Sequence, residues 1–231
     1  MNILIIGAAG GIGSQLVIDL NEANANLFLG FNENPVPSSF KSRKVDARDF
    51  NSVHTFVEDG LQELGSIDGV VNLSGSLILK PSHLCTEKEF EDTINTNLKS
   101  AFSVVRSCGS LLKNTAIVLM STAAASIGLA NHELIASSKA GVEGLMRSAS
   151  KTYARKNIRV NTVSPGLVDT PLTSTITSNK ISLSASEKMH SLQRIGKPKD
   201  ISNMIKYLIK PENDWITGQN FVIDGGLSSS K

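Results

Sequence analysis

Short apolar runs alternate along this chain with longer segments in which apolar residues recur at helical spacing. Buried strands of a parallel sheet are continuous apolar runs of about four to eight residues. We predict such strands over residues 2–6, 27–31, 43–45, 68–73, 115–120, 158–163 and 220–223. We predict helices over residues 10–23, 50–64, 87–112, 133–156 and 199–208. Pro35 and Pro37 leave residues 32–40 too interrupted for a helix.

This alternation of strands and helices predicts an α/β fold, a doubly wound parallel sheet of about seven strands with helices on both faces. No internal repeat divides the chain, so we expect one domain over residues 1–227 and a flexible tail over residues 228–231. The turns that follow parallel strands open on one edge of the sheet, where ligands bind. The residues that follow each strand are therefore the candidate site residues.

Composition and charge narrow the classes of function. The 231 residues are 40% hydrophobic and 19% charged, as in ordinary soluble proteins, and a net charge of +2 does not favour nucleic acid or a membrane surface as a partner. Cys85 and Cys108 have no nearby histidines at ligand spacing, so we expect two reduced thiols and no metal site. We see no signal peptide and no apolar run of about 20 residues, and we expect a cytoplasmic protein.

The sequence GAAGGIG, from Gly7 to Gly13, directly follows the first predicted strand and opens the first helix. Glycines let a backbone turn tightly and approach a ligand closely, and the amides at a helix start bind phosphate groups. In this position the spacing favours a dinucleotide site over a purely structural turn.

Further motifs follow the other predicted strands. They are Asp46-Ala47, Asn72 to Gly75, Ser121-Thr122 and RVNTVSPGLVDT (159–170), together with Asn97 in NTNLKSAF and Lys139 in SSKAGVEGL. With the glycine turn, they resemble the motifs of the classical short-chain dehydrogenase/reductase family over essentially the whole chain. The resemblance implies a Rossmann-like fold, NAD(P) as cofactor and oxidoreductase activity on a small-molecule substrate.

The resemblance also implies roles for particular residues. The cofactor-binding residues would be Gly7, Gly11, Ile12, Gly13, Asn32, Asp46, Ala47, Ser74, Gly75, Lys139, Pro165, Gly166, Val168 and Thr170. Residues 167–193 would form a mobile lid over the substrate. The family commonly builds dimers and tetramers from the two long helices, here 87–112 and 133–156, so a homodimer or homotetramer is expected.

The choice between NAD and NADP depends on the end of the second strand. An acid there binds the ribose hydroxyls of NAD, whereas a basic residue favours NADP. Phe31 and Asn32 occupy the discriminating positions and are neither acidic nor basic, while Glu33 follows in the loop. Asn32 can hydrogen-bond a hydroxyl or a phosphate, and Arg43 or Lys44 lies within possible reach of a phosphate. We lean slightly towards NADP(H).

One residue of the family's catalytic set, the tyrosine, is missing from this sequence. The family uses a tyrosine four residues before the lysine as proton donor, and here Ile135 stands at that position. Thr122 occupies the position of the family's serine, with Ser121 beside it, and Asn97 and Lys139 match the family. We therefore expect catalytic roles for Asn97, Thr122 and Lys139.

Three replacements for the tyrosine remain open: His132, seven residues before Lys139, Thr122, or a water molecule bound to Lys139. The alternative for His132 is that it is a solvated histidine in a loop and has no catalytic role. We expect an NAD(P)-dependent oxidoreductase with a non-standard proton donor. The alternatives are a dinucleotide-binding sensor or partner subunit without reductase activity, and a structural protein that no longer binds the cofactor.

Overall fold

Seven parallel strands form a single sheet in the computed structural model, which describes residues 1–229. The strands are β1 (Asn2–Ile6), β2 (Asn26–Phe31), β3 (Lys41–Lys44), β4 (Gly69–Asn72), β5 (Thr115–Met120), β6 (Ile158–Pro165) and β7 (Asn220–Ile223). Their order across the sheet is β3-β2-β1-β4-β5-β6-β7, so the chain reverses its direction of winding between β1 and β4. The predicted parallel, doubly wound sheet is confirmed.

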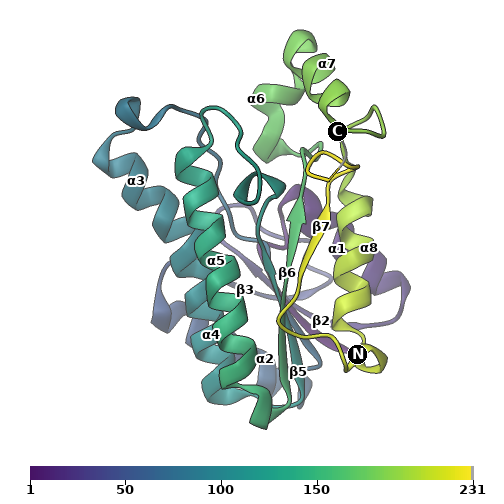
Figure 1. The fold of residues 1–231 in the computed structure, drawn as a ribbon. Coiled ribbons are helices and arrows are strands. Elements are labelled where there is room, and N and C mark those ends of the chain that lie inside the picture. The colour runs from purple at the N-terminus through teal and green to yellow at the C-terminus, as the bar shows by residue number, and fades with distance from the viewer. Residues whose placement is uncertain (230–231) are drawn as a thin grey trace.

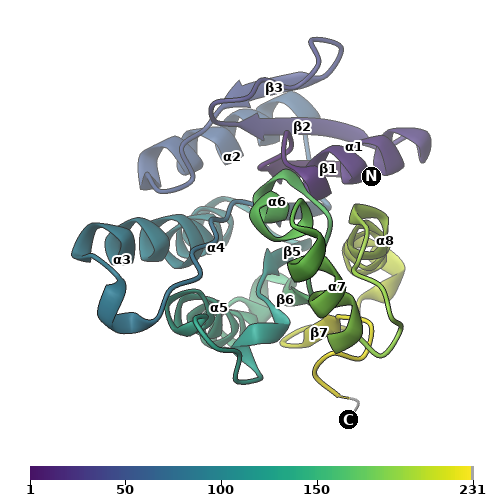
Figure 2. The ribbon, with the colours of Figure 1, turned by 90° about the horizontal axis from the view of Figure 1, so that it is seen from above.

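Helices cover both faces of the sheet (Figures 1 and 2). One face carries α1 (Gly11–Glu22) and α8 (Pro198–Ile209), and the other carries α2 (Phe50–Leu64), α4 (Ser100–Leu111) and α5 (Glu133–Thr152). Two short helices, α6 (Ser174–Thr177) and α7 (Lys180–Met189), stand above the carboxyl ends of the strands in Figure 1. Single 3₁₀ turns occupy Ser82–Leu84, Ala123–Ala125, Ala154–Lys156, Pro171–Thr173 and Pro211–Asn213.

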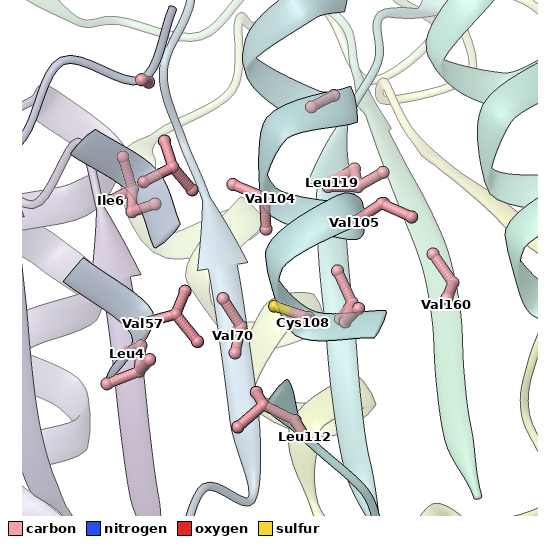
Figure 3. Close-up of a cluster of buried hydrophobic side chains, with 14 of the residues drawn as sticks. Leu4, Ile6, Val57, Val70, Val104, Val105, Cys108, Leu112, Leu119 and Val160 are labelled. Atoms are coloured by element: carbon pink, nitrogen blue, oxygen red, sulfur yellow. The ribbon is translucent and has the colours of Figure 1, made fainter. Parts of the chain in front are cut away.

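The sheet is buried on both sides because its strands are apolar at successive positions. Side chains of Leu4, Ile6 and Val70 pack against α2 and α4, whereas those of Ile3 and Ile5 pack against α1 and α8. Figure 3 shows the first of these two clusters, with Cys108 at its centre. Burial raises the pKa of Cys108 to about 12, so this thiol stays protonated and serves as a small apolar side chain.

Two predicted helices differ from the structure. The segment 87–112 is not one regular helix, because α3 (Glu87–Ile94) passes through a π-helical turn at Asn95–Lys99 before α4 begins. Such a turn inserts one extra residue per turn and is common at functional sites. The helix predicted to end at residue 156 ends at Thr152, and Asn157 closes the following turn with a positive φ of 53°.

The predicted tail over residues 228–231 is described only in part. Ser228 donates its amide to Asp224 Oδ2 at 2.8 Å, while residues 230–231 lie outside the described residues.

A buried carboxylate that the sequence did not reveal joins α1 to α8. The side chain of Asp19 has no exposed surface, and it accepts hydrogen bonds from Gln15 Nε2 at 2.9 Å, from Lys199 Nζ at 2.5 Å and from Ser202 Oγ. Burial raises the pKa of Asp19, but the hydrogen bonds outweigh burial and lower it to about 2. Ionised Asp19 therefore stabilises the contact between the two helices.

Replacing this carboxylate should destabilise the protein most at neutral pH. We expect Asp19→Asn to lower the free energy of unfolding by about 2 kcal/mol at pH 7, which corresponds to the lowering of the pKa. Because the folded pKa lies below the unfolded value, this contribution is complete above pH 3.8 and is lost as the pH falls towards 2. Urea unfolding at pH 7 and pH 3 measures both effects. The exposed Glu58→Gln change is the control, and equal stability of Asp19→Asn and Glu58→Gln would contradict the assignment.

Candidate functional site

The glycine turn lies at the carboxyl end of β1, where the strand order reverses. Gly7 has a φ of +81°, and a Cβ there would lie 3.1 Å from the amide nitrogen of Ser74 after β4. A Cβ on Gly13 would lie 2.3 Å from the carbonyl oxygen of Gly7, so only glycine fits. The first turn of α1 thus packs directly against the end of β1, at the place where doubly wound folds bind ligands.

The start of α1 has the properties of a phosphate cradle. Its N-cap is Gly10, which gives no side-chain cap, and the first turn has no acidic residue. Amides at an uncapped helix start, together with the helix dipole, attract an anion. A Cβ on Gly11 would lie 2.8 Å from Cβ of Thr170, so the loop after β6 rests on the same turn. The backbone around Gly11 and Ile12 therefore fits the diphosphate of a dinucleotide.

The predicted adenosine-binding residues follow β2 and β3, which come next to β1 in the sheet order β3-β2-β1. Asp46 follows β3, and its carboxylate accepts from Arg48 Nε and Nη2, both at 2.9 Å. These hydrogen bonds hold the pKa of Asp46 below its usual value despite partial burial. Ala47 is buried, and Asn32 is exposed immediately after β2. Arg43 pairs instead with Asp59 of α2.

The turn after β4 continues the site towards α4. Asn72 is buried and its Oδ1 accepts from the amide of Ser74 at 3.1 Å, so its side chain holds the loop. A Cβ on Gly75 would meet Asn97 Oδ1 at 3.2 Å and Lys139 Nζ at 3.7 Å. At Gly75 the turn after β4 therefore meets the π-helical turn that holds Asn97 and the helix α5 that holds Lys139.

Lys139 is buried without a carboxylate partner. Its Nζ donates to the carbonyl oxygen of Met120 at 3.0 Å, the one hydrogen bond that this ammonium makes within residues 1–229. Burial lowers the pKa of Lys139 from 10.5 to about 8, because the charged form loses hydration. An ammonium with unused donors therefore faces the region between Gly75 and Asn97.

The other predicted catalytic residues, Asn97 and Thr122, lie in the π-helical turn and in the turn after β5. The π-helical turn places Asn97 in the interior, where its Nδ2 donates to Ser76 Oγ and to the carbonyl oxygen of Thr93, both at 3.0 Å. Thr122 Oγ1 accepts from the amide of Ala124 at 3.3 Å. Ile135 is 4% exposed and lies one helical turn before Lys139, so an apolar side chain fills the position of the family's tyrosine.

Ser121 and His132 take positions that restrict their roles. The hydroxyl of Ser121 donates to Glu143 Oε1 at 2.7 Å, which turns it away from Thr122 and into the packing of α5 on the sheet. His132 stands at the N-cap of α5, and its Nδ1 lies 2.8 Å from the carbonyl oxygen of Ala130. Nδ1 therefore carries a proton, and Nε2 is the ring nitrogen left for other contacts.

The segment from Pro165 to Thr170 connects β6 to α6 and α7, in the region that the sequence predicts to be a lid. Pro165 is buried at the end of the strand, the Gly166 amide donates to the carbonyl oxygen of Ile223 at 3.1 Å, and Val168 is buried beside Gly196. These contacts hold the start of the segment that carries α6 and α7. His190 at the end of α7 is also buried, with its Nδ1 2.7 Å from the carbonyl oxygen of Ser186.

Sequence reasoning missed three residues of this region. Ser76 binds Asn97, Glu143 binds Ser121 and also Asn220 Nδ2 at 3.2 Å, and Arg48 binds Asp46. Glu143 lies one turn beyond Lys139 on the same helix, and that spacing was a usable signal. Ser76 and Arg48 each lie close behind a strand-end motif, but nothing in their spacing indicates which way the side chains fold.

Neither a metal centre nor a membrane segment was found in the described part of the chain. No group of three or more potential metal ligands from histidine, cysteine, aspartate and glutamate occurs among residues 1–229. Within the same range, none of the helices has the length and apolar content that a bilayer crossing requires.

Comparison with known proteins places the chain in a family. A family model described as Enoyl-(Acyl carrier protein) reductase matches residues 7–228. The chain is similar to the hydroxynaphthalene reductase-like protein Arp2 of Metarhizium acridum, with 30% identity over 96% of this chain and 93% of the relative. It is also similar to the 3-oxoacyl-[acyl-carrier-protein] reductase FabG of Thermotoga maritima, with 32% identity over 97% of this chain and 96% of the relative. The chain belongs to the short-chain dehydrogenase/reductase family.

Solved structures agree with this assignment, among them that of a short chain dehydrogenase family protein from Francisella tularensis, with a TM-score of 0.88 at 25% identity over 99% of both chains. The structure of ElxO with NADP bound superposes with a TM-score of 0.90 at 25% identity, and covers 99% of both chains. The chain is therefore an oxidoreductase-family protein with the family's Rossmann-like fold, and the glycine cradle lies where that family's motif predicts it.

Proposed function

We propose that this protein is an NAD(P)-dependent oxidoreductase in which Lys139, rather than a tyrosine, supplies the proton. The observation that carries the proposal is the Lys139 ammonium, buried at the site with one hydrogen-bond acceptor, beside an isoleucine where the family has its acid. Gly7, Gly11 and Gly13 would hold the diphosphate of the cofactor, and Lys139 would also bind the nicotinamide ribose. When bound, the nicotinamide ring supplies or accepts a hydride.

The residues around Lys139 can handle the charge that develops on the substrate. Hydride addition to a polar double bond leaves negative charge on its oxygen or nitrogen, which needs a donor in the transition state. The ammonium can provide this proton directly or through one bound water molecule. The lowered pKa of about 8 favours transfer, since a general acid works best when its pKa lies near the working pH.

The substrate-facing surface suits a small, partly apolar molecule. Leu172 and Met189 on the lid are about half exposed, so they offer apolar surface above the site. Thr122 supplies a hydroxyl, and Ile135 adds an apolar wall where the family has a polar one. We infer that conjugated double bonds, imines and unactivated carbonyls are the substrate classes to test.

The pH dependence of turnover tests the role of Lys139. We expect NADPH or NADH oxidation with a panel of cyclic imines, enones and ketones to fall as the pH rises through about 8, because reduction needs the ammonium form. His132→Ala should leave this profile unchanged. A loss of activity in His132→Ala would assign the proton to the histidine instead. Saturable binding of a nucleotide without turnover of any substrate class would favour a dinucleotide-binding protein without reductase activity.

A further inference from the structure

One oxygen of the Glu143 carboxylate joins α5 to three neighbouring strands of the sheet, β5, β6 and β7. Its Oε1 accepts from Ser121 Oγ after β5 at 2.7 Å, from Asn220 Nδ2 in β7 at 3.2 Å and from Ser164 Oγ in β6 at 3.4 Å. The side chain of Glu143 is only 13% exposed, so water competes little for these hydrogen bonds. Glu143 therefore fixes the position of α5 on this part of the sheet.

The residue that Glu143 holds most closely, Ser121, lies between two groups of the candidate site. Ser121 Oγ is also 3.4 Å from the carbonyl oxygen of Lys139, which lies one helical turn before Glu143 on α5. Met120, directly before Ser121, provides the carbonyl oxygen that accepts from Lys139 Nζ at 3.0 Å. Thr122, with its hydroxyl, directly follows Ser121. The contact between Glu143 and Ser121 therefore sets α5 against the segment that carries both groups.

The charge of Glu143 has a smaller part in this arrangement than its accepting oxygen. Glu143 Oε2 lies 4.0 Å from Nη1 of Arg147, whose side chain is 61% exposed. An ion pair with such an exposed partner contributes little to stability. Burial is the cause of the lowered pKa of Lys139, and the charge of Glu143 does not contribute to it. Any effect of Glu143 on Lys139 should therefore act through geometry.

We propose that Glu143 is a positioning residue, which holds α5 against Ser121 so that Lys139 and Thr122 have the correct geometry for the reaction. This inference rests on the proposed function, since it assigns Glu143 a part in the same chemistry. Without the contact to Ser121, α5 could shift away from the end of β5. The Lys139 ammonium would then lose the carbonyl oxygen of Met120, its one acceptor within residues 1–229. A buried ammonium that lacks an acceptor gives up its proton more readily.

Four substitutions separate the accepting oxygen from the charge. Glu143→Leu removes both carboxylate oxygens, whereas Glu143→Gln keeps an oxygen acceptor without the charge. Ser121→Ala removes the donor alone. Arg147→Gln is the matched control on the same helix, because it removes only the outer partner of Glu143. The wild type and each variant are unfolded with urea at a series of pH values from 6 to 10. The kcat of NADPH or NADH oxidation is measured with a substrate that the wild type reduces.

The expected result is a shift in pH dependence together with a loss of turnover. The wild type should become more stable as the pH rises above about 8, because the unfolded state then holds the Lys139 proton more tightly than the folded state. In Glu143→Leu and Ser121→Ala this rise should begin about one pH unit lower. The same two variants should lose about 10- to 100-fold in kcat, since misplaced groups react slowly. Glu143→Gln should retain most of the kcat and the wild-type pH dependence, and Arg147→Gln should match the wild type in both.

Each contrary result has a distinct meaning. A folded Glu143→Leu with the pH dependence and kcat of the wild type would overturn the proposal, since the contacts of Glu143 would then only support the fold. Equal losses in Glu143→Gln and Glu143→Leu would also overturn it, because the charge would then matter more than the acceptor. If Glu143→Leu does not fold, an unchanged Ser121→Ala overturns the proposal in its place. A wild type that reduces no substrate refutes the proposed function, whereas the pH dependence of stability still tests whether Glu143 positions Lys139.

Discussion

Ile135→Tyr is expected to raise the rate of reduction of simple ketones by about 10²-fold or more, because a general acid contributes about 10²–10⁴-fold to such a step. Ile135 is buried one helical turn before Lys139, so a phenol built at this position would have its hydroxyl beside the ammonium. A neighbouring cation lowers the pKa of a phenol and prepares it to give up its proton. Thr122 and Asn97 match the family's serine and asparagine positions, so one side chain would complete the family's set. Initial rates of NADPH and NADH oxidation measure the gain.

The Ile135→Phe variant is the control, because it introduces the aromatic ring without the hydroxyl. It therefore distinguishes the effect of the hydroxyl on the rate from the effect of the larger side chain. Both aromatic variants enlarge a buried side chain and should cost about 1–3 kcal/mol of stability, which urea unfolding measures. A gain that is confined to the tyrosine variant identifies the missing acid as the barrier. Equal rates in the two variants, or no gain in Ile135→Tyr while the variant remains folded and binds the nucleotide, would show that the pocket differs from the family's by more than one residue.

Lys139→Met is expected to abolish measurable NADPH and NADH binding while it makes the nucleotide-free protein more stable at pH 7. Burial lowers the pKa of Lys139 to about 8, so the folded state holds the charged form at a cost of about 3 kcal/mol below that pH. Methionine removes this cost and also removes the hydrogen bond to Met120, which contributes about 1 kcal/mol. We therefore expect a net gain of about 1–2 kcal/mol in the free energy of unfolding.

The difference in stability between wild type and Lys139→Met should depend on pH, because Lys139 titrates at different pH values in the folded and unfolded states. Between pH 8 and 10.5 the unfolded state binds more protons at Lys139 than the folded state, so the stability of the wild type rises with pH over this window. The methionine variant should lack that rise, so the two stabilities should be equal near about pH 9, and the wild type should be more stable by about 1 kcal/mol at pH 10. Urea unfolding at pH 7 and pH 10 decides the matter. A variant that is less stable than the wild type at pH 7 would show that Lys139 is better solvated than its burial indicates.

Much of the fold could be predicted from local patterns. The four apolar side chains of Ile3–Ile6 can all be buried only in a strand whose sheet is covered on both faces. The glycines that follow this strand indicate a tight turn from strand to helix. The interruption of the helix at Asn95 could not be predicted in this way. The segment has helical spacing throughout, and the π-helical turn becomes favourable only through buried contacts of Asn97 with Ser76 and Thr93.

In the candidate site too, some residues could be identified from the sequence, whereas their contacts could not. The resemblance to the family's motifs identified Gly7, Asp46, Lys139 and the missing tyrosine at Ile135, because each lies at the family's offset from a strand or from another motif residue. The partners of these residues could not be inferred, since they arise from side-chain directions and not from sequence separation. Asp19 is the clearest example. Its partners Lys199 and Ser202 lie on α8, near the C-terminal end of the chain, so nothing in the sequence around Asp19 indicates the contact.

The sequence by itself determined the parallel α/β fold, the glycine turn and the absence of a tyrosine before Lys139, because each depends on local composition and spacing. The tertiary structure alone decided that Lys139 is buried with one acceptor, that Ser121 faces Glu143, and that the guanidinium of Arg48 lies on Asp46. These properties depend on which charges share a low-dielectric space, and on whether their hydrogen-bonding groups find partners there.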